Sequence, residues 1–156
     1  MRTTCLIFSL MILLAGCDLS DKEEGSDNKL SWQKTDTLII WSVDAANETR
    51  QRVFEPDDSV SIPEPLINGI HQMWPEAGVF IKGQRTDTLV VGLKNESWLT
   101  DQIGNEGAEA FLSFAALNLL EMKNINHVYF DITPGMHAAS DTWQDDDFID
   151  WKVIKK

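Results

Sequence analysis

Residues 106–122 (EGAEAFLSFAALNLLEM) constrain the fold most, because their spacing predicts a helix that is apolar around most of its circumference. The main apolar stripe of this helix contains Ala108, Phe111, Leu112, Ala115, Leu119 and Met122, and Phe114 and Leu117 extend the apolar surface around it. Asn105 is suited to cap the start of the helix, and Asn124 is suited to close its end. A helix with so few polar positions must be buried, so the chain needs a sheet or further helices to cover it.

Four segments rich in β-branched and aromatic residues predict strands, at residues 37–44, 79–82, 88–94 and 128–132. The two middle segments are joined by a polar connection and predict a hairpin. Ser61 and Glu64 match a capping box, so a second helix should follow and end at Trp74, which precedes a proline. For residues 45–58 we expect a short helix and then a loop.

The order strand, helix, hairpin, helix, strand predicts an α+β fold: a single small domain with a mixed sheet of about four strands and two main helices packed on one face. We expect the strand at residues 128–132 to pair with the first strand and with the hairpin. Because side chains alternate along a strand, one set of positions should face the helices. This set is Val79, Ile81, Leu89, Val91, Leu93, Val128, Phe130 and Ile132. The same alternation places Phe80, Val90 and Tyr129 on the opposite face.

The first 17 residues predict a secretory leader and a lipid anchor. Arg2 supplies a positive charge, and residues 6–14 form an apolar run that is too short to cross a bilayer. The following Leu-Ala-Gly-Cys resembles the bacterial lipobox, in which the cysteine is acylated and becomes the first mature residue. We expect residues 1–16 to be a lipoprotein signal peptide and Cys17 to be the lipidation site. The alternatives are an ordinary cleaved signal with a chance cysteine, and a buried core helix.

Removal of the 16-residue leader from the 156-residue chain leaves 140 residues, the size of one domain. The leader carries one arginine and no acid, so the net charge falls from −12 to −13. An acidic surface repels phosphate backbones and anionic headgroups, which argues against nucleic acid as a partner and leaves membrane attachment to the lipid. Residues 17–30 predict the lipidated cysteine and a flexible acidic tether, and residues 31–156 predict the folded domain. Both the periplasmic side of a membrane and the cell surface fit this tether.

The sequence contains no pattern that predicts catalysis, a metal site or a cofactor. None of His71, His127 and His137 has the i, i+4 histidine partner of a helical zinc site. Ser140 lies close to His137 but without a G-x-S-x-G elbow, and residues 145–147 (DDD) lack the alternating ligands and the glycine of a calcium loop. We therefore predict that the protein is not an enzyme and that it binds no cofactor or metal.

Three successive segments together form one pattern. The first is a strand that ends in an acidic turn, the second is a helix with a Gly/Ala-rich start, and the third is a further strand. They are residues 86–96 (TDTLVVGLKNE), 106–120 (EGAEAFLSFAALNLL) and 125–132 (INHVYFDI), with Gly135 following. Through them, the chain resembles the sporulation-and-germination (GerMN) domain of bacterial envelope lipoproteins. The family usually has Leu-Leu-x-Gly-Pro and a long loop after its first helix, whereas this chain has the shorter MWPEAG. The resemblance implies a module that binds other cell-envelope proteins and has no catalytic residues.

We predict a membrane-anchored envelope lipoprotein that acts as a non-catalytic protein-interaction module. The alternative is a lipid-anchored enzyme or small-ligand binder whose site is assembled from residues far apart in sequence. The C-terminal segment, which contains Phe148 and Trp151, is expected to cover most of the sheet face opposite the helices. A contact site would then lie along the rim of that face, near Trp143 and residues 145–147. The candidate partner surface comprises Phe80, Val90, Tyr129, Trp143 and Trp151.

Overall fold

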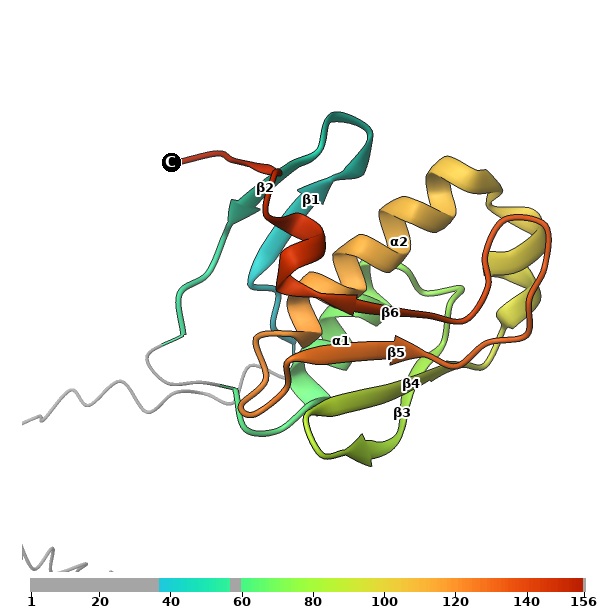
Figure 1. Cartoon of the computed structure of the whole chain (residues 1–156), viewed down its shortest axis with the longest axis horizontal. Helices are drawn as coiled ribbons and strands as arrows, with labels where there is room; N and C mark the ends of the chain where they lie inside the picture. Colours follow the sequence, from blue (N-terminus) through green and yellow to red (C-terminus); the bar gives the residue numbers. More distant parts are fainter. Residues whose placement is uncertain (1–36, 57–59, 156) are drawn as a thin grey trace, which may run out of the picture. The chain divides into compact units, whose positions relative to one another are not determined.

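The computed structural model describes residues 37–56 and 60–155, which form two β-sheets, two α-helices and short helical turns (Figure 1). In chain order the elements are β1 (Trp41–Asp44), η1 (Ala45–Asn47), β2 (Thr49–Arg52), α1 (Glu64–Met73), β3 (Val79–Arg85), β4 (Thr88–Leu93), η2 (Trp98–Gln102), α2 (Gly104–Leu119), β5 (His127–Phe130), β6 (Asp141–Gln144), η3 (Asp145–Phe148) and β7 (Lys152–Val153). The predicted leader, the predicted lipidation site at Cys17 and the predicted tether lie outside the described residues.

The larger sheet has four strands in the order β3-β4-β5-β6. Strands β4 and β5 run parallel and the two outer pairs run antiparallel, so the sheet is mixed as predicted. The α+β prediction is confirmed, but the chain forms two sheets where one was predicted, because β1 pairs with β2 and β2 pairs with β7. The prediction that β5 pairs with the first strand is wrong. Its second partner is β6, whose sequence DTWQ has a single apolar residue and gave no strand signal.

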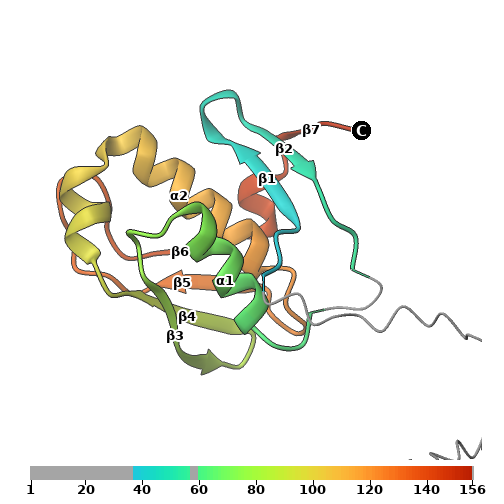
Figure 2. The same cartoon turned by 180° about the vertical axis from the view of Figure 1, so that it is seen from behind.

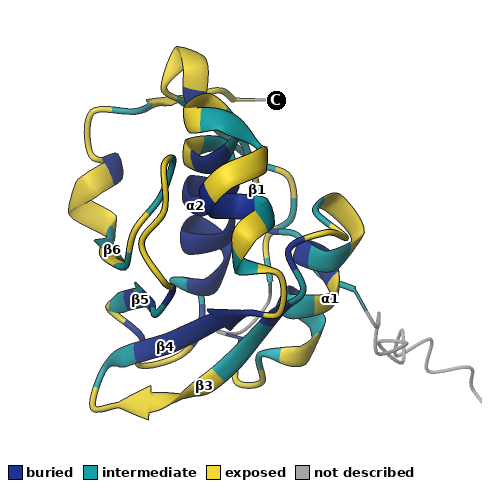
Figure 3. Cartoon of the chain, turned by 90° about the vertical axis from the view of Figure 1, so that its right-hand side faces the viewer, coloured by how far each residue is buried: buried dark blue, intermediate teal, exposed yellow. Residues whose placement is uncertain are grey.

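Helices α1 and α2 share one core with the inner face of the four-stranded sheet (Figure 3). The strand positions predicted to face the helices are all buried except Ile81, which lies on the edge strand β3 and is half-buried. Phe111 of α2 is at the centre of this core. Its ring centroid lies 5.8 Å from that of Trp74, 5.6 Å from Trp98 and 6.4 Å from Phe130. The predicted burial of α2 is therefore confirmed by aromatic packing on several sides.

The two helices begin at residues other than the predicted ones. Pro63 occupies the N-cap position of α1, where Ser61 was expected. Helix α2 begins at Gly104, whose φ of 80° turns the chain out of η2, so Asn105 lies inside its first turn instead of capping it. The helix ends at Leu119, and Asn124 adopts its positive φ of 62° only in the turn that follows. The helical pattern was found correctly, whereas its ends were misplaced by a few residues.

A buried amide attaches β1 to α2. Asn118 is 1% exposed, and its Oδ1 accepts hydrogen bonds from the backbone N–H groups of Ile40 at 2.8 Å and Trp41 at 3.0 Å. Its Nδ2 donates to the carbonyl oxygens of Trp41 at 3.0 Å and Phe114 at 2.9 Å. The amide oxygen therefore accepts two hydrogen bonds and the amide nitrogen donates two, so this buried side chain is fully satisfied. These bonds hold the smaller sheet against the helix layer.

The C-terminal segment packs on the helix side of the four-stranded sheet. Trp143 lies opposite Val128, a residue that faces the helices, and its ring stacks on Phe148 at 5.5 Å. Phe148 is fully buried, and its ring also meets the Trp151 ring nearly at right angles, with the centroids 5.2 Å apart. Strand β7 then joins β2, as seen from behind in Figure 2. The prediction that this segment covers the opposite sheet face is therefore wrong, because β6 delivers the tail to the helix side.

Candidate binding face

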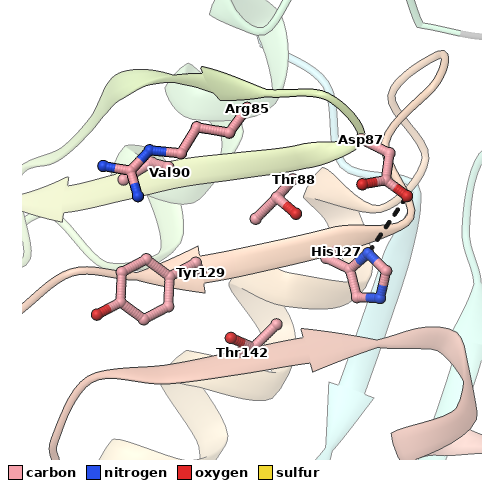
Figure 4. A pocket seen from close by; sticks show the side chains of 7 residues that line it. All are labelled: Arg85, Asp87, Thr88, Val90, His127, Tyr129 and Thr142. Carbon is pink, nitrogen blue, oxygen red and sulfur yellow. Dashed lines mark ion pairs between the residues drawn. The ribbon is translucent and has the colours of Figure 1, made fainter.

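The face of the four-stranded sheet that points away from the helices is the candidate site, and we call it the open face. On β4 and β5, Thr88 lies opposite His127 and Val90 lies opposite Tyr129, while Thr142 of β6 lies opposite Tyr129. Figure 4 shows these side chains gathered on one surface. The open face comprises Phe80, Lys82, Arg85, Thr88, Val90, His127, Tyr129 and Thr142.

Two adjoining hollows mark the open face. The larger, of about 410 Å³, is lined by Arg85, Asp87, Thr88, Val90, His127, Tyr129 and Thr142. The smaller, of about 350 Å³, is lined by Lys82, Gly83, Gln84, Arg85, Val90 and Asp131. Arg85 lines both hollows, and its side chain runs along β4 beside Val90 (Figure 4). Since all these residues belong to the strands or to the positions next to them, no other described element covers this part of the sheet.

An electrostatic pair stands at one end of the larger hollow. The buried Nδ1 of His127 lies 3.5 Å from Asp87 Oδ2, which is an ion-pair distance but too long for a well-formed hydrogen bond. Asn126 Nδ2 donates to the same carboxylate oxygen at 3.1 Å. This Asn126 hydrogen bond is the main cause that lowers the pKa of Asp87, with smaller contributions from backbone hydrogen bonding and from His127. The Asp87 carboxylate is therefore engaged, and it lies at the far end of the hollow from the Arg85 guanidinium (Figure 4).

A second ion pair closes the smaller hollow. Lys82 Nζ donates to the carbonyl oxygen of Asp131 at 2.8 Å and to Asp131 Oδ2 at 3.0 Å. A β-bulge interrupts the pairing of β3 at this point, and Phe80 and Lys82 both stand over Gly92 of β4. A side chain at Gly92 would run into both of them. The charge of Lys82 is therefore compensated within the domain.

Arg85 differs from Lys82, because it has no carboxylate partner within residues 37–56 and 60–155. Its side chain is exposed, and its guanidinium lies in the half of the hollow that Val90 and Tyr129 line (Figure 4). In the same described ranges, the hydroxyl groups of Thr88, Tyr129 and Thr142 make no hydrogen bond to another residue. The open face therefore offers one cation and three hydroxyl groups to a ligand, whereas its carboxylates are already occupied.

The structure brings together part of the predicted partner surface. Phe80 and Tyr129 are half-buried on the open face, and Val90, which is 6% exposed, forms its floor. Trp143 and Trp151 do not join them, since both rings pack against Phe148 on the helix side. The prediction of Trp143 and Trp151 as part of this surface is wrong, because the C-terminal segment that carries them lies on the helix side of the sheet.

Sequence reasoning missed the polar residues of the open face. The sequence predicts Arg85 in the polar connection between two strands, but β3 continues through it to a turn at Thr86 and Asp87. Strand alternation continued from Val79 and Ile81 would have turned Arg85 toward the helices, whereas the β-bulge between Ile81 and Gly83 shifts the register and brings Arg85 opposite Thr88 on the open face. The sequence pattern bears on His127 only through the spacing of metal ligands, and it gives no signal for Thr142 because it does not predict the strand that contains this residue.

The other candidate residues for chemistry, His71, His137 and Ser140, make structural contacts. His71 Nε2 lies 2.9 Å from the carbonyl oxygen of Val79, and His137 Nδ1 lies 2.8 Å from Asn105 Oδ1. Ser140 Oγ donates to the carbonyl oxygen of Ile132 at 2.7 Å. In the part of the chain that the structure describes, no group of three or more His, Cys, Asp or Glu side chains could hold a metal ion. Among the helices of that part, none is long and apolar enough to cross a bilayer.

Comparison with known proteins adds no further constraint. No protein-family model matches the chain, and neither a curated protein nor a solved structure matches it. The GerMN resemblance therefore stays a prediction from the residues that carry it.

Proposed function

We propose that the protein is a lipid-anchored lipoprotein of the bacterial cell envelope that acts as a non-catalytic protein-interaction module, with the open face as its contact surface. The observation that carries the proposal is the sheet face itself, which no other described element covers where its two hollows lie. This face combines aromatic and aliphatic area from Phe80, Val90 and Tyr129 with the unpaired cation of Arg85. Aromatic residues and arginine are enriched at protein interfaces, where they supply much of the binding energy.

The order of elements gives support to the proposed GerMN-like character of the domain. Helix α1, the β3–β4 hairpin, α2 and β5 follow one another from residue 64 to residue 130, in the order on which the resemblance rests. The resemblance to that family implies that this domain binds other envelope proteins. A partner in the envelope also fits a chain whose leader predicts export and whose Cys17 predicts lipid attachment.

The second candidate is a small-ligand binder or enzyme that uses the larger hollow. The pairing of His127 with Asp87 favours it, since a carboxylate orients the imidazole of many general-base histidines. However, no described hydroxyl group donates to His127, so the pair lacks an adjacent nucleophile to activate. The geometry therefore supports binding better than catalysis.

Position-specific cross-linking in living cells tests the contact surface. A photoreactive phenylalanine derivative replaces Tyr129 or Thr142 in the full-length lipoprotein, and exposed Glu109 on α2 serves as the matched control position. We expect one defined adduct from both open-face positions and none from position 109. The captured protein, identified by mass spectrometry and purified, should bind the native chain at least tenfold more tightly than the Tyr129→Ala variant. Equal adducts from all three positions would contradict the proposal.

The anchor is tested separately through Cys17. We expect Cys17→Ala to accumulate as an uncleaved precursor and to incorporate no radiolabelled palmitate, because the acylated thiol is absent. The Cys5→Ala variant is the control, since Cys5 lies in the predicted leader, and it should be processed and labelled normally. Palmitate label retained by Cys17→Ala would contradict lipidation at this residue.

A further inference from the structure

One charged side chain of the open face, Arg85, has no ion-pair partner in the part of the chain that the structure describes. Lys82 is neutralised by Asp131, and Asp87 is engaged by Asn126 and His127. Among these charges of the open face, Arg85 is the one without a counter-charge in the described residues, on a protein whose net charge is −12. An uncompensated guanidinium on an acidic protein makes this hollow a local exception to the overall repulsion of anions. The field of Arg85 acts over about the 8 Å Debye length of physiological salt.

The hydroxyl groups around Arg85 favour an oxygen-rich anion. Thr88, Tyr129 and Thr142 lie on three adjacent strands and line the same hollow of about 410 Å³. A hydroxyl can donate one hydrogen bond, and a guanidinium presents two parallel N–H groups that match the two oxygens of a carboxylate. Val90 and the Tyr129 ring provide apolar surface for the methylene groups that precede such a carboxylate. The site is therefore built for a planar anion on a short aliphatic stem.

The carboxylate of Asp87 limits the charge of the ligand. Asp87 lines the larger hollow, so an anion beside Arg85 has a like charge at the other end of that hollow, whereas the charge of Asp131 in the smaller hollow is offset by Lys82. Repulsion grows with the charge of the ligand, which disfavours a phosphate dianion more than a carboxylate monoanion. Polyanions such as nucleic acids or anionic membranes also meet the acidic remainder of the protein.

We infer that the Arg85 hollow binds the carboxylate of a glutamate or aspartate side chain that a partner protein presents to the open face. Arg85 forms the paired hydrogen bonds to the carboxylate, and the hydroxyl groups of Thr88, Tyr129 and Thr142 complete its solvation. This inference rests on the proposed function, because it names the chemistry by which the open face recognises its protein partner.

Chemical-shift titration of the full-length lipoprotein in detergent micelles tests the inference. The probe is N-acetyl-glutamate N-methylamide, which presents a glutamate side chain with a peptide group on each side. Its neutral match is N-acetyl-glutamine N-methylamide. We expect saturable shifts of the Thr88, Tyr129 and Thr142 amides with the glutamate probe, and none with the glutamine probe. The Arg85→Gln variant should weaken binding at least fivefold, whereas Lys123→Gln, which removes an exposed cation elsewhere, should leave it unchanged.

Two further arms separate the sources of the anion. Acetate that binds as tightly as the glutamate probe would overturn the assignment to a peptide, and inorganic phosphate that binds more tightly would overturn the choice of a monoanion. Equal affinity of Arg85→Gln and the native chain, with both spectra folded, would remove Arg85 from the site. Cross-linking at Tyr129 without glutamate binding would support the protein-interaction function and overturn only the inference that Arg85 binds a carboxylate of the partner. Glutamate binding without any cross-linked protein would instead reject the protein partner.

Discussion

The two faces of the four-stranded sheet are made by the same strands and differ in almost every other property. Along β5, Val128 and Phe130 are fully buried against the helices, while His127 and Tyr129 are half-buried on the open face. The inner face is closed by aromatic packing around Phe111, and the outer face is hollowed and polar. Because alternation assigns neighbouring residues to opposite faces, stability and recognition can be changed separately by substitutions one position apart.

The treatment of polar groups sharpens this comparison. On the inner side, Asn118 makes four hydrogen bonds with backbone groups, so that none of its own polar atoms is left to a ligand. On the open face, Arg85 and three hydroxyl groups are without described partners. A buried polar group destabilises the fold unless it is hydrogen-bonded, whereas an exposed one is solvated by water and stays available to a ligand. The two arrangements therefore indicate a structural role for the inner face and a binding role for the open face.

The largest effect is expected from Phe111, at the centre of the inner face. Phe111→Ala removes a fully buried ring that contacts three other aromatic rings and leaves a cavity. Such a truncation lowers the free energy of unfolding by about 3–5 kcal/mol, a large share of the total of about 5–15 kcal/mol. Thermal or urea unfolding followed by circular dichroism measures this loss. A melting curve equal to that of the native chain would break the assignment of the inner face.

A smaller but clear effect is expected from Asn118. Asn118→Ala leaves the backbone groups of Ile40 and Trp41 without their partner, at about 1–3 kcal/mol for a buried group left unsatisfied. Ser113→Ala is the matched control on the same helix. Its hydroxyl is buried but donates only to the carbonyl oxygens of Glu109 and Ala110, which belong to its own helix. The urea midpoint should fall for Asn118→Ala and barely move for Ser113→Ala. Equal shifts would mean that Asn118 does not join β1 to α2.

The neighbouring residues Tyr129 and Phe130 provide the most direct test of the two faces. Tyr129→Ala should lower the free energy of unfolding by only about 0.2–1 kcal/mol, the range of a cross-strand pair, because its ring lies on the open face. Phe130→Ala, one residue along the strand, should cost about 3–5 kcal/mol. Both values come from the same urea unfolding measurement. A Tyr129→Ala variant as unstable as Phe130→Ala would show that the open face is part of the core.

The sequence predicts the inner face better than the open face, and the reason is physical. Burial of apolar side chains leaves a periodic pattern, so α2 and the strand positions around Val91, Val128 and Phe130 could be found from their spacing. Strand β6 could not, because it is short, polar and stabilised by pairing with β5 and not by its own composition. Because β6 was not predicted, the C-terminal segment was expected on the wrong side of the sheet.

The second sheet and the polar residues of the site depend on contacts far apart in sequence. Asn118 joins Ile40 across 78 positions, and Asp87 meets Asn126 across 39. A single asparagine in an apolar helix or a single aspartate in a turn has no periodicity that announces such a partner. Strand alternation alone would have turned Arg85 toward the helices, because it does not predict the β-bulge between Ile81 and Gly83. The lack of a counter-charge at Arg85 is visible only when all its neighbours are known.

The smallest effect concerns the acidic end of the open face. The pKa of Asp87 is lowered from its ordinary value of 3.8, chiefly by the Asn126 hydrogen bond and to a lesser degree by the charge of His127. A carboxyl group with a lowered pKa in the folded state stabilises that state above its ordinary pKa, and this contribution is lost as the pH falls through the lowered value. Native protein should therefore lose stability on acidification below about pH 4 more steeply than Asn126→Ala, in which the pKa of Asp87 returns toward its ordinary value.

Carbon-detected NMR of the Asp87 carboxyl group over pH 2–6 (roughly two units on either side of its ordinary pKa) measures this directly, with Asn126→Ala and His127→Ala as a matched pair. Both substitutions should raise the pKa of Asp87, and Asn126→Ala should raise it more, because the hydrogen bond from Asn126 acts at 3.1 Å whereas His127 lies 3.5 Å away without a well-formed bond. The effect on unfolding should be far below that of any inner-face substitution, since Asp87 stands at the solvent-exposed turn of the hairpin. A larger rise in the pKa of Asp87 in His127→Ala than in Asn126→Ala would make His127 the main partner of Asp87. That result would favour the catalytic alternative for this hollow over the binding function.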